Sequence, residues 1–124
     1  MTEVRVLVVD DQEPFRRAMA AVADETDGFV VVGVVGSGEE SVAAADELRP
    51  DLVLMDVNLP GISGVEAARQ LKAGGRGPIV LLLSTYDEEE FDHQGCGASA
   101  YVPKGAFSPE RLTQEWAAAS GEQV

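Results

Sequence analysis

Cysteine is nearly absent from this sequence of 124 residues, which contains only Cys96. A single cysteine cannot form a disulfide within the chain, and it cannot supply the thiolates of a metal cluster. Basic residues are also few, because nine Lys and Arg accompany 22 Asp and Glu and leave a formal net charge of −13. Most of the surface therefore repels phosphates, so we expect no direct binding of nucleic acid or of an anionic membrane by this chain.

Long hydrophobic runs are absent as well. The first apolar run, Val6 to Val9, is interrupted by Asp10 and Asp11, whereas a membrane helix needs about 20 apolar residues. Together with the single cysteine, this predicts a cytoplasmic protein. The length suits one domain spanning residues 1–124, and the composition of 45% hydrophobic and 25% charged residues is that of a globular protein with its own core.

Short runs rich in Val, Ile and Leu alternate with segments of helical pattern. The predicted strands are Arg5–Val9, Phe29–Val35, Asp51–Met55, Ile79–Leu83 and Ser99–Val102. Strands that are apolar on both sides need helices on both faces, and their alternation with helices is typical of a parallel sheet. We therefore predict an α/β fold with a doubly wound, five-stranded parallel sheet.

The helical segments carry recognisable start and stop signals. Ser37 and Ser63 each precede a glutamate by three residues, which is the spacing of a capping box, and Ser108 precedes a proline suited to a first turn. The first helix is predicted to end before Gly28 and to bury one face, because apolar residues recur there at helical spacing. The residues of that face are Phe15, Ala18, Met19 and Val22.

Polar residues follow the ends of four predicted strands. Because the carboxyl ends of parallel strands meet at one edge of a sheet, we expect these side chains to converge. Clustered carboxylates need a cation between them, and an all-oxygen ligand set suits Mg²⁺. With a lysine and a hydroxyl nearby, such a set can hold the oxygens of a transferring phosphoryl group. The residues concerned are Asp10, Asp11, Asp56, Ser84 and Lys104.

Four segments of the chain closely resemble the receiver domain of two-component response regulators. They occur in the family's order, and the resemblance covers essentially the whole chain. It implies a flavodoxin-like sheet with strand order 2-1-3-4-5 and a signalling switch instead of an enzyme that turns over an external substrate. The segments are LVVDDQEP (Leu7–Pro14), LVLMDVNLPGISG (Leu52–Gly64), LLLST (Leu81–Thr85) and AYVPKGA (Ala100–Ala106).

The resemblance also implies the chemistry of the site. Asp56 is expected to accept a phosphoryl group from a sensor histidine kinase or a phosphotransfer protein in a reaction that requires Mg²⁺. The metal ligands would be Asp10, Asp11, Asp56 and the backbone carbonyl of Asn58. Lys104 would pair with the phosphoryl oxygens.

Further residues match positions that transmit or tune the signal in receivers. Ser84 matches the hydroxyl that follows the new phosphate, and Thr85 takes the small-residue position beside it. Tyr101 matches the aromatic residue whose rotamer changes with that hydroxyl. Asn58 and Tyr86 match the two variable positions that tune the lifetime of the phosphoryl group.

Two features depart from the family pattern. Ser84 and Lys104 are closer in sequence than is usual in receivers, and Gly95 and Gly97 fall within the shortened stretch. We therefore expect the fourth helix, between the fourth and fifth strands, to be shortened or irregular. In receivers the face formed by the fourth helix, fifth strand and fifth helix carries homodimer or output contacts, so we expect that face to be remodelled. Pro103 precedes the lysine where many receivers place proline after it, which leaves open a cis peptide at this site.

Other functions fit parts of the pattern. Taken singly, the paired acids suit a helix N-terminus and Lys104 suits a solvated surface, so only the joint pattern supports phosphoryl transfer. A pseudo-receiver that binds partners without phosphorylation is the alternative, although its usual mark is loss of the acidic pair, the acceptor or the lysine. A phosphoaspartyl hydrolase would need Asp-x-Asp on the first strand, whereas Asp10 and Asp11 are adjacent. The segment PKGAFSPERL resembles receivers joined to helix-turn-helix DNA-binding domains, which suggests transcription as one output. A stand-alone receiver that acts through protein contacts or a phosphorelay fits the sequence equally well.

His93 lies near Cys96, a pairing that could indicate a metal site or a nucleophile. No third ligand or orienting residue accompanies the two, and a loop location without catalysis is the favoured interpretation.

Overall fold

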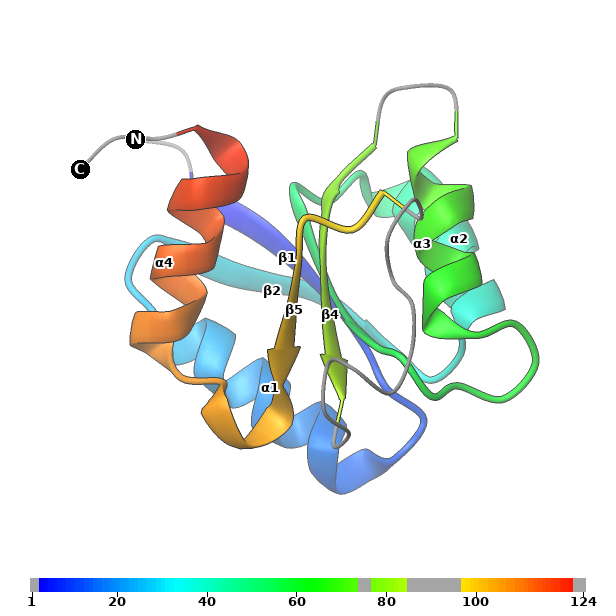
Figure 1. The fold of residues 1–124 in the computed structure, drawn as a ribbon, viewed down its shortest axis with the longest axis horizontal. Helices are drawn as coiled ribbons and strands as arrows, with labels where there is room; N and C mark the ends of the chain where they lie inside the picture. The colour runs from blue at the N-terminus through cyan, green and yellow to red at the C-terminus, as the bar shows by residue number, and fades with distance from the viewer. Residues whose placement is uncertain (1–2, 74–76, 85–96, 122–124) are drawn as a thin grey trace.

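The computed structural model describes residues 3–73, 77–84 and 97–121. Its strands and helices alternate along the chain, and the five strands form one parallel sheet in the order β2-β1-β3-β4-β5 (Figure 1). This confirms the predicted fold class and strand order. The elements are β1 (Val4–Val9), α1 (Glu13–Glu25), β2 (Phe29–Val35), α2 (Gly38–Leu48), β3 (Leu52–Asp56), α3 (Gly64–Lys72), β4 (Ile79–Ser84), β5 (Ala100–Pro103), a 3-10 turn (Lys104–Ala106) and α4 (Pro109–Ser120).

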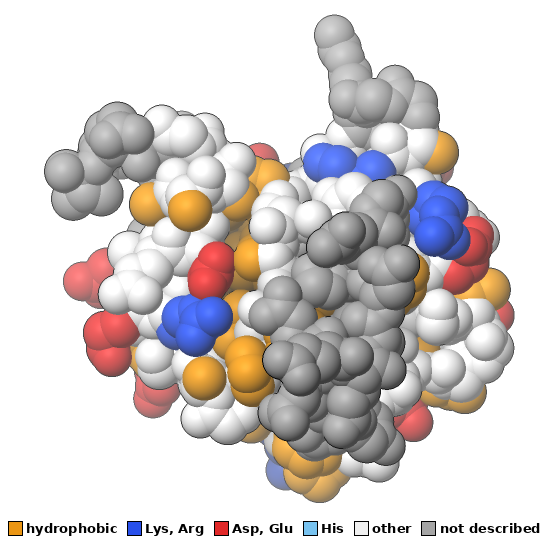
Figure 2. All heavy atoms as spheres, in the orientation of Figure 1, with side chains coloured by type: hydrophobic (Ala, Val, Ile, Leu, Met, Phe, Trp, Pro, Cys, Tyr) orange, Lys and Arg blue, Asp and Glu red, His pale blue; other side chains and the backbone are white. Residues whose placement is uncertain are grey.

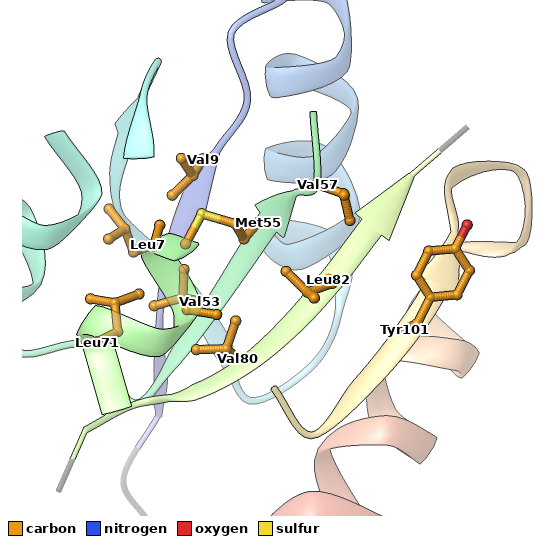
Figure 3. Packing of buried hydrophobic residues seen from close by; sticks show 11 residues of the cluster. Leu7, Val9, Val53, Met55, Val57, Leu71, Val80, Leu82 and Tyr101 are labelled. Atoms are coloured by element: carbon orange, nitrogen blue, oxygen red, sulfur yellow. The ribbon is translucent and has the colours of Figure 1, made fainter. Parts of the chain in front are cut away.

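Each central strand contributes alternate side chains to two separate cores, because successive residues of a strand point to opposite faces. In β1, Leu7 and Val9 pack on the side of α2 and α3, whereas Val6 and Val8 pack on the side of α1 and α4. Figure 1 shows the sheet between these two helical layers, and Figure 3 shows the residues of the first core. The strands are therefore apolar on both faces, which explains their nearly continuous hydrophobic runs.

The buried face of α1 differs from the prediction. Met19 is buried as expected, but Ala18 is exposed, and Phe15 and Val22 are only partly buried. The second buried residue is Ala23, which lies one helical turn after Met19 and packs against the same core. Fewer residues of α1 are buried against the sheet than the apolar pattern indicates. The first turn of the helix lies near the carboxyl ends of the strands.

The predicted N-caps are all present. Ser37, Ser63 and Ser108 each accept a hydrogen bond at 3.1 Å from the backbone N–H three residues later. Each bond satisfies one of the amide groups that a helix leaves without an internal partner at its start. The serines therefore set where α2, α3 and α4 begin, and with them the lengths of the loops that surround the carboxyl edge of the sheet.

Two predictions fall on residues outside the described ranges. These are the shortened or irregular fourth helix within 87–96 and the loop location of His93 and Cys96. Within the described residues every peptide bond is trans, including the bonds on both sides of Pro103. No helix in this described part of the chain combines the length and apolar character needed to span a membrane.

Gly64 is required where α3 meets the end of β3. A Cβ placed at Gly64 would overlap the carbonyl oxygen of Asp56 and lie 2.8 Å from the Cα of Val57. Alanine favours a helix over glycine by about 1 kcal/mol, but here the backbone leaves no room for it. We predict that Gly64→Ala lowers the free energy of unfolding by about 2–3 kcal/mol in urea denaturation.

Gly105→Ala is the matched control, because a Cβ at Gly105 has no neighbour within 4 Å. We expect its stability to stay within about 0.5 kcal/mol of the parent protein. Equal stabilities for the two variants would contradict the proposed close approach of α3 to β3.

Candidate functional site

The carboxyl ends of three neighbouring strands bring the predicted polar residues to one edge of the sheet. Asp10 directly follows β1, while Asp56 and Ser84 are the last residues of β3 and β4. Lys104 follows β5, which pairs with β4. Because β1 lies beside β3, Asp10 lies beside Asp56. The chain that leaves the edge strand β5 then brings Lys104 toward both carboxylates.

The ammonium group of Lys104 contacts two buried carboxylates. Its Nζ lies 2.7 Å from Oδ2 of Asp10 and 3.6 Å from Oδ1 of Asp56. The lysine side chain is only 10% exposed, and the aspartate side chains are 0% and 7% exposed. Charges removed from water in this way are tolerated only when they are paired and hydrogen-bonded, so the three side chains form one electrostatic unit.

Backbone amide groups hold both buried carboxylates in place. The N–H of Gln12 donates to Oδ1 of Asp10 at 2.9 Å, and the N–H of Asn58 donates to Oδ1 of Asp56 at 3.3 Å. Each bond spans two residues and is the local Asx pattern of a turn. Arg16 donates from its guanidinium to the carbonyl oxygen of Asp10 at 2.9 Å, which ties α1 to the end of β1.

The site carries more negative charge than its lysine neutralises. Asp10, Asp11 and Asp56 offer carboxylate oxygens that all lie within 4.8 Å of one another. Burial raises the pKa of Asp56 to about 6, and the negative charges of Asp10 and Asp11 act in the same direction. Lys104 and the Asn58 amide act against this rise in the pKa but do not cancel it.

This donor set fits a hard divalent cation. Carboxylate oxygens are the ligands that Mg²⁺ prefers, and Mg²⁺ commonly retains several waters and takes only one or two carboxylates from a protein. Asp11 is exposed to solvent, whereas Asp10 and Asp56 are buried, so the cluster combines fixed ligands with an open side.

The other predicted residues lie at different depths around this cluster. Ser84 is fully buried at the end of β4, and Tyr101 is 6% exposed on β5. Figure 3 shows the Tyr101 hydroxyl pointing toward the end of the sheet at which the strand arrows finish. Asn58 is exposed in the loop after β3. Thr85 and Tyr86 lie outside the described residues.

Two residues at the site were not singled out by the motif. The ring of Phe15 lies under the Lys104 ammonium, with Nζ 3.9 Å from the ring centroid. Its position in the first turn of α1 was the available signal, because that turn begins at the carboxyl end of β1, where the paired acids lie. Glu39, in the first turn of α2, accepts a hydrogen bond from the N–H of Ile62 at 3.2 Å and so anchors the loop between β3 and α3. The sequence contains no comparable signal for Glu39, because the contact joins the first turn of α2 to a loop 23 residues further along the chain.

A family model and similar proteins of known sequence assign this chain to the same family. The family described as "Response regulator receiver domain" matches residues 6–117. "Response regulator GacA" of Pseudomonas viridiflava is 43% identical over 111 residues, which cover 88% of this chain and 52% of that protein. "Uncharacterized transcriptional regulatory protein YxjL" of Bacillus subtilis is 33% identical over 124 residues, covering 98% of this chain and 57% of that protein. The chain thus spans about half the length of these curated relatives.

Solved structures agree with that family. The signal receiver domain of the putative response regulator NarL from Mycobacterium tuberculosis superposes with a TM-score of 0.88 at 26% identity, covering 98% of this chain and 100% of that one. The response regulator domain of CheB from Thermotoga maritima gives 0.82 at 27% identity, covering 98% and 99%.

The raised pKa of Asp56 predicts a pH-dependent stability. Between pH 4 and 6 the folded protein retains a proton on Asp56 that the unfolded chain has lost, so this group lowers the free energy of unfolding as the pH rises. Above pH 6 Asp56 is ionised in the folded protein as well, so the free-energy cost of burying its charge is fully present. Without divalent cations, Asp56→Asn should therefore be more stable than the parent protein at pH 8 by about 1–3 kcal/mol, and equally stable near pH 4.

Urea denaturation from pH 4 to 8 measures this difference in stability. Asp46→Asn, on the exposed surface of α2, is the control, and its free energy of unfolding should equal that of the parent protein at every pH. A gain that is the same at every pH, or a loss at pH 8, would show that the cost of burying the Asp56 charge has been misjudged.

Proposed function

The chain belongs to the response regulator receiver domain family, and we propose that Asp56 is its phosphoacceptor. The observation that supports this most strongly is the placement of Asp56 at the end of β3, with an ammonium 3.6 Å from its Oδ1 and two further carboxylates beside it. An acceptor needs a nucleophilic oxygen and nearby positive charge for the incoming phosphoryl group, and Mg²⁺ with an aspartyl phosphate is typical of this family.

The proposed step transfers a phosphoryl group from a phosphohistidine of a sensor histidine kinase or phosphotransfer protein. A carboxylate oxygen of Asp56 attacks the phosphorus, an O–P bond forms, and the N–P bond to the donor imidazole breaks as that nitrogen takes up a proton. Because its pKa is about 6, Asp56 is largely ionised at neutral pH and available for attack. Lys104, already within 3.6 Å, then pairs with the oxygens of the transferred group.

Asp10, Asp11, Asp56 and the backbone carbonyl of Asn58 are the proposed Mg²⁺ ligands. When bound there, Mg²⁺ neutralises charge on the phosphoryl oxygens during transfer. The chain's own contribution is to keep Asp10 fixed through the Gln12 amide and to leave Asp11 in solvent.

We further propose that Ser84 and Tyr101 convert the new charge into a change of shape. Both residues are buried, so a hydroxyl that turns toward the phosphoryl group alters the packing around β4 and β5. A change from 1% to 99% active needs about 5.5 kcal/mol. Two or three charge-assisted contacts of roughly 1.5–3 kcal/mol each are of that size. The proposals for Thr85 as part of this switch, and for Asn58 and Tyr86 as lifetime-tuning positions, rest on the family pattern.

The output is proposed to lie outside this chain. Residues 1–124 would be a single receiver domain, and the curated relatives, about twice as long, include proteins whose names describe transcriptional regulation. The proposed contact for an output domain or for a homodimer is the family's face of fourth helix, fifth strand and fifth helix, to which β5 and α4 belong here. Figure 2 shows acidic side chains over the α4 side and only small, separate groups of basic ones, which agrees with a net charge of −13 and a role without direct nucleic-acid binding. A cytoplasmic location is part of the proposal.

The proposal is tested by intact mass after incubation with acetyl phosphate and Mg²⁺. One added phosphoryl group is expected in the parent protein and in Asp46→Asn, whose carboxylate is exposed on α2. No addition is expected for Asp56→Asn or when Mg²⁺ is chelated, because the nucleophile or the charge neutralisation is then missing.

Fast hydrolysis could hide the adduct, so binding of beryllofluoride is measured by fluorine NMR in the same samples. If the parent protein neither gains mass nor binds beryllofluoride, Asp56 is not a phosphoacceptor. The chain would then be a pseudo-receiver that acts as a protein-interaction module.

A further inference from the structure

The Lys104 ammonium has an aromatic neighbour in addition to its carboxylate partners. Nζ lies 3.9 Å from the centroid of the Phe15 ring and 2.7 Å from Oδ2 of Asp10. A cation at this distance over the face of a ring is attracted by the ring's quadrupole, most strongly where water is excluded. With only 10% of the lysine side chain exposed, this ammonium lies in such a place.

Core packing does not account for Phe15. Its side chain is half-buried and is not among the residues of either core cluster in the described part of the chain. It instead lines an open cavity of about 380 Å³ together with Met19, Phe107 and Lys104. An aromatic side chain that lines this cavity from the first turn of α1 is therefore placed against the lysine and not within a core cluster.

Lysine needs such a constraint more than the other groups of the site. The two buried carboxylates are short and are held by backbone amides at 2.9 and 3.3 Å, whereas the lysine has four rotatable bonds and a strongly hydrated head. The ion pairs to Asp10 and Asp56 come from the ends of β1 and β3, at one edge of the sheet. A third contact, from α1, further limits the positions open to the ammonium.

We propose that Phe15 is a positioning residue for Lys104: its ring, through a cation–π contact, keeps the ammonium in place to receive the phosphoryl group on Asp56. This inference rests on the proposed function. It assigns to α1 a part in the chemistry that the strand-end residues do not supply. The prediction is that the rate of phosphorylation depends on the electron density of the ring and not only on its shape.

The test replaces Phe15 site-specifically with mono-, di- and trifluorinated phenylalanine, which weaken the ring quadrupole stepwise while nearly preserving its shape. The cavity beside the ring gives the fluorine atoms room. The rate of phosphorylation by acetyl phosphate at saturating Mg²⁺ should fall with each added fluorine. Phe15→Leu, which removes the quadrupole and keeps an apolar side chain, should lower the rate by about threefold to tenfold, and Phe15→Trp should restore it.

Phe29 provides the matched control. Its ring packs edge-on against Trp116 at 6.2 Å, in the core between the sheet and α4. The same fluorination at Phe29 should leave the phosphorylation rate unchanged, even where it changes stability. A flat series at Phe15, a rate that rises with fluorination, or an equal effect at Phe29 would overturn the inference.

A proton NMR measurement separates failure of this inference from failure of the proposed function. The ring current of Phe15 should shift the ε-methylene protons of Lys104 upfield, and the shift should disappear in Phe15→Leu. If the shift is present and the parent protein accepts a phosphoryl group, a flat fluorine series rejects only the positioning role. If the parent protein accepts none, the proposed function fails and the positioning role fails with it.

Discussion

The carboxyl edge of the sheet is organised around one ammonium group shared by two buried carboxylates. Lys104 lies 2.7 Å from Asp10 and 3.6 Å from Asp56, and none of the three side chains is more than 10% exposed. Removing Lys104 would leave two buried carboxylates without their cation, which is far more costly than losing a surface ion pair. The position of β1 beside β3, and the return of the chain from β5 toward them, are therefore coupled to this one interaction.

The same arrangement leaves the site with more negative charge than its lysine neutralises. One lysine faces three carboxylates within 4.8 Å of one another, and burial raises the pKa of Asp56 to about 6. Stability and reactivity are in tension here, since the residue that is costly to ionise is the one proposed to attack phosphorus. The segments around Asp56 are closely fixed: α3 begins directly against the Asp56 carbonyl, where only glycine fits, and Glu39 of α2 anchors the loop that follows β3.

The sequence predicts those parts of the structure that depend on local pattern. Strand composition and serine caps lead to the parallel α/β sheet, and the strand-end polar residues lead to the meeting of Asp10, Asp56 and Lys104, because the carboxyl ends of parallel strands lie at one edge. The strand order was predicted from the family resemblance. The buried face of α1 could not be read in the same way. Ala18 and Ala23 are the same residue type, but only Ala23 shares the face of Met19 that α1 turns toward the sheet, so Ala18 is exposed and Ala23 is buried.

Contacts between segments that are distant in the chain could not be predicted from the sequence either. Phe15 has the apolar character of a core residue, and its placement under Lys104 depends on how the turn after β5 returns over α1. The bond from Ile62 to Glu39 joins a loop to the first turn of α2, and no sequence motif links the two. Assignments such as the roles of Ser84 and Tyr101 rest on the family pattern and on their burial in the described structure, so they remain proposals.

The most direct test of this account is the free energy of unfolding as a function of Mg²⁺ concentration at pH 8, with ionic strength held constant by NaCl. A cation that completes the cluster of Asp10, Asp11 and Asp56 should stabilise the protein along a one-site saturation curve, because it binds the folded chain alone. Asp11→Asn should flatten that curve, whereas Asp27→Asn, which removes an exposed carboxylate outside the cluster, should leave it unchanged. Equal stability with and without Mg²⁺ in the parent protein would contradict the central claim that the buried carboxylates form a cation site.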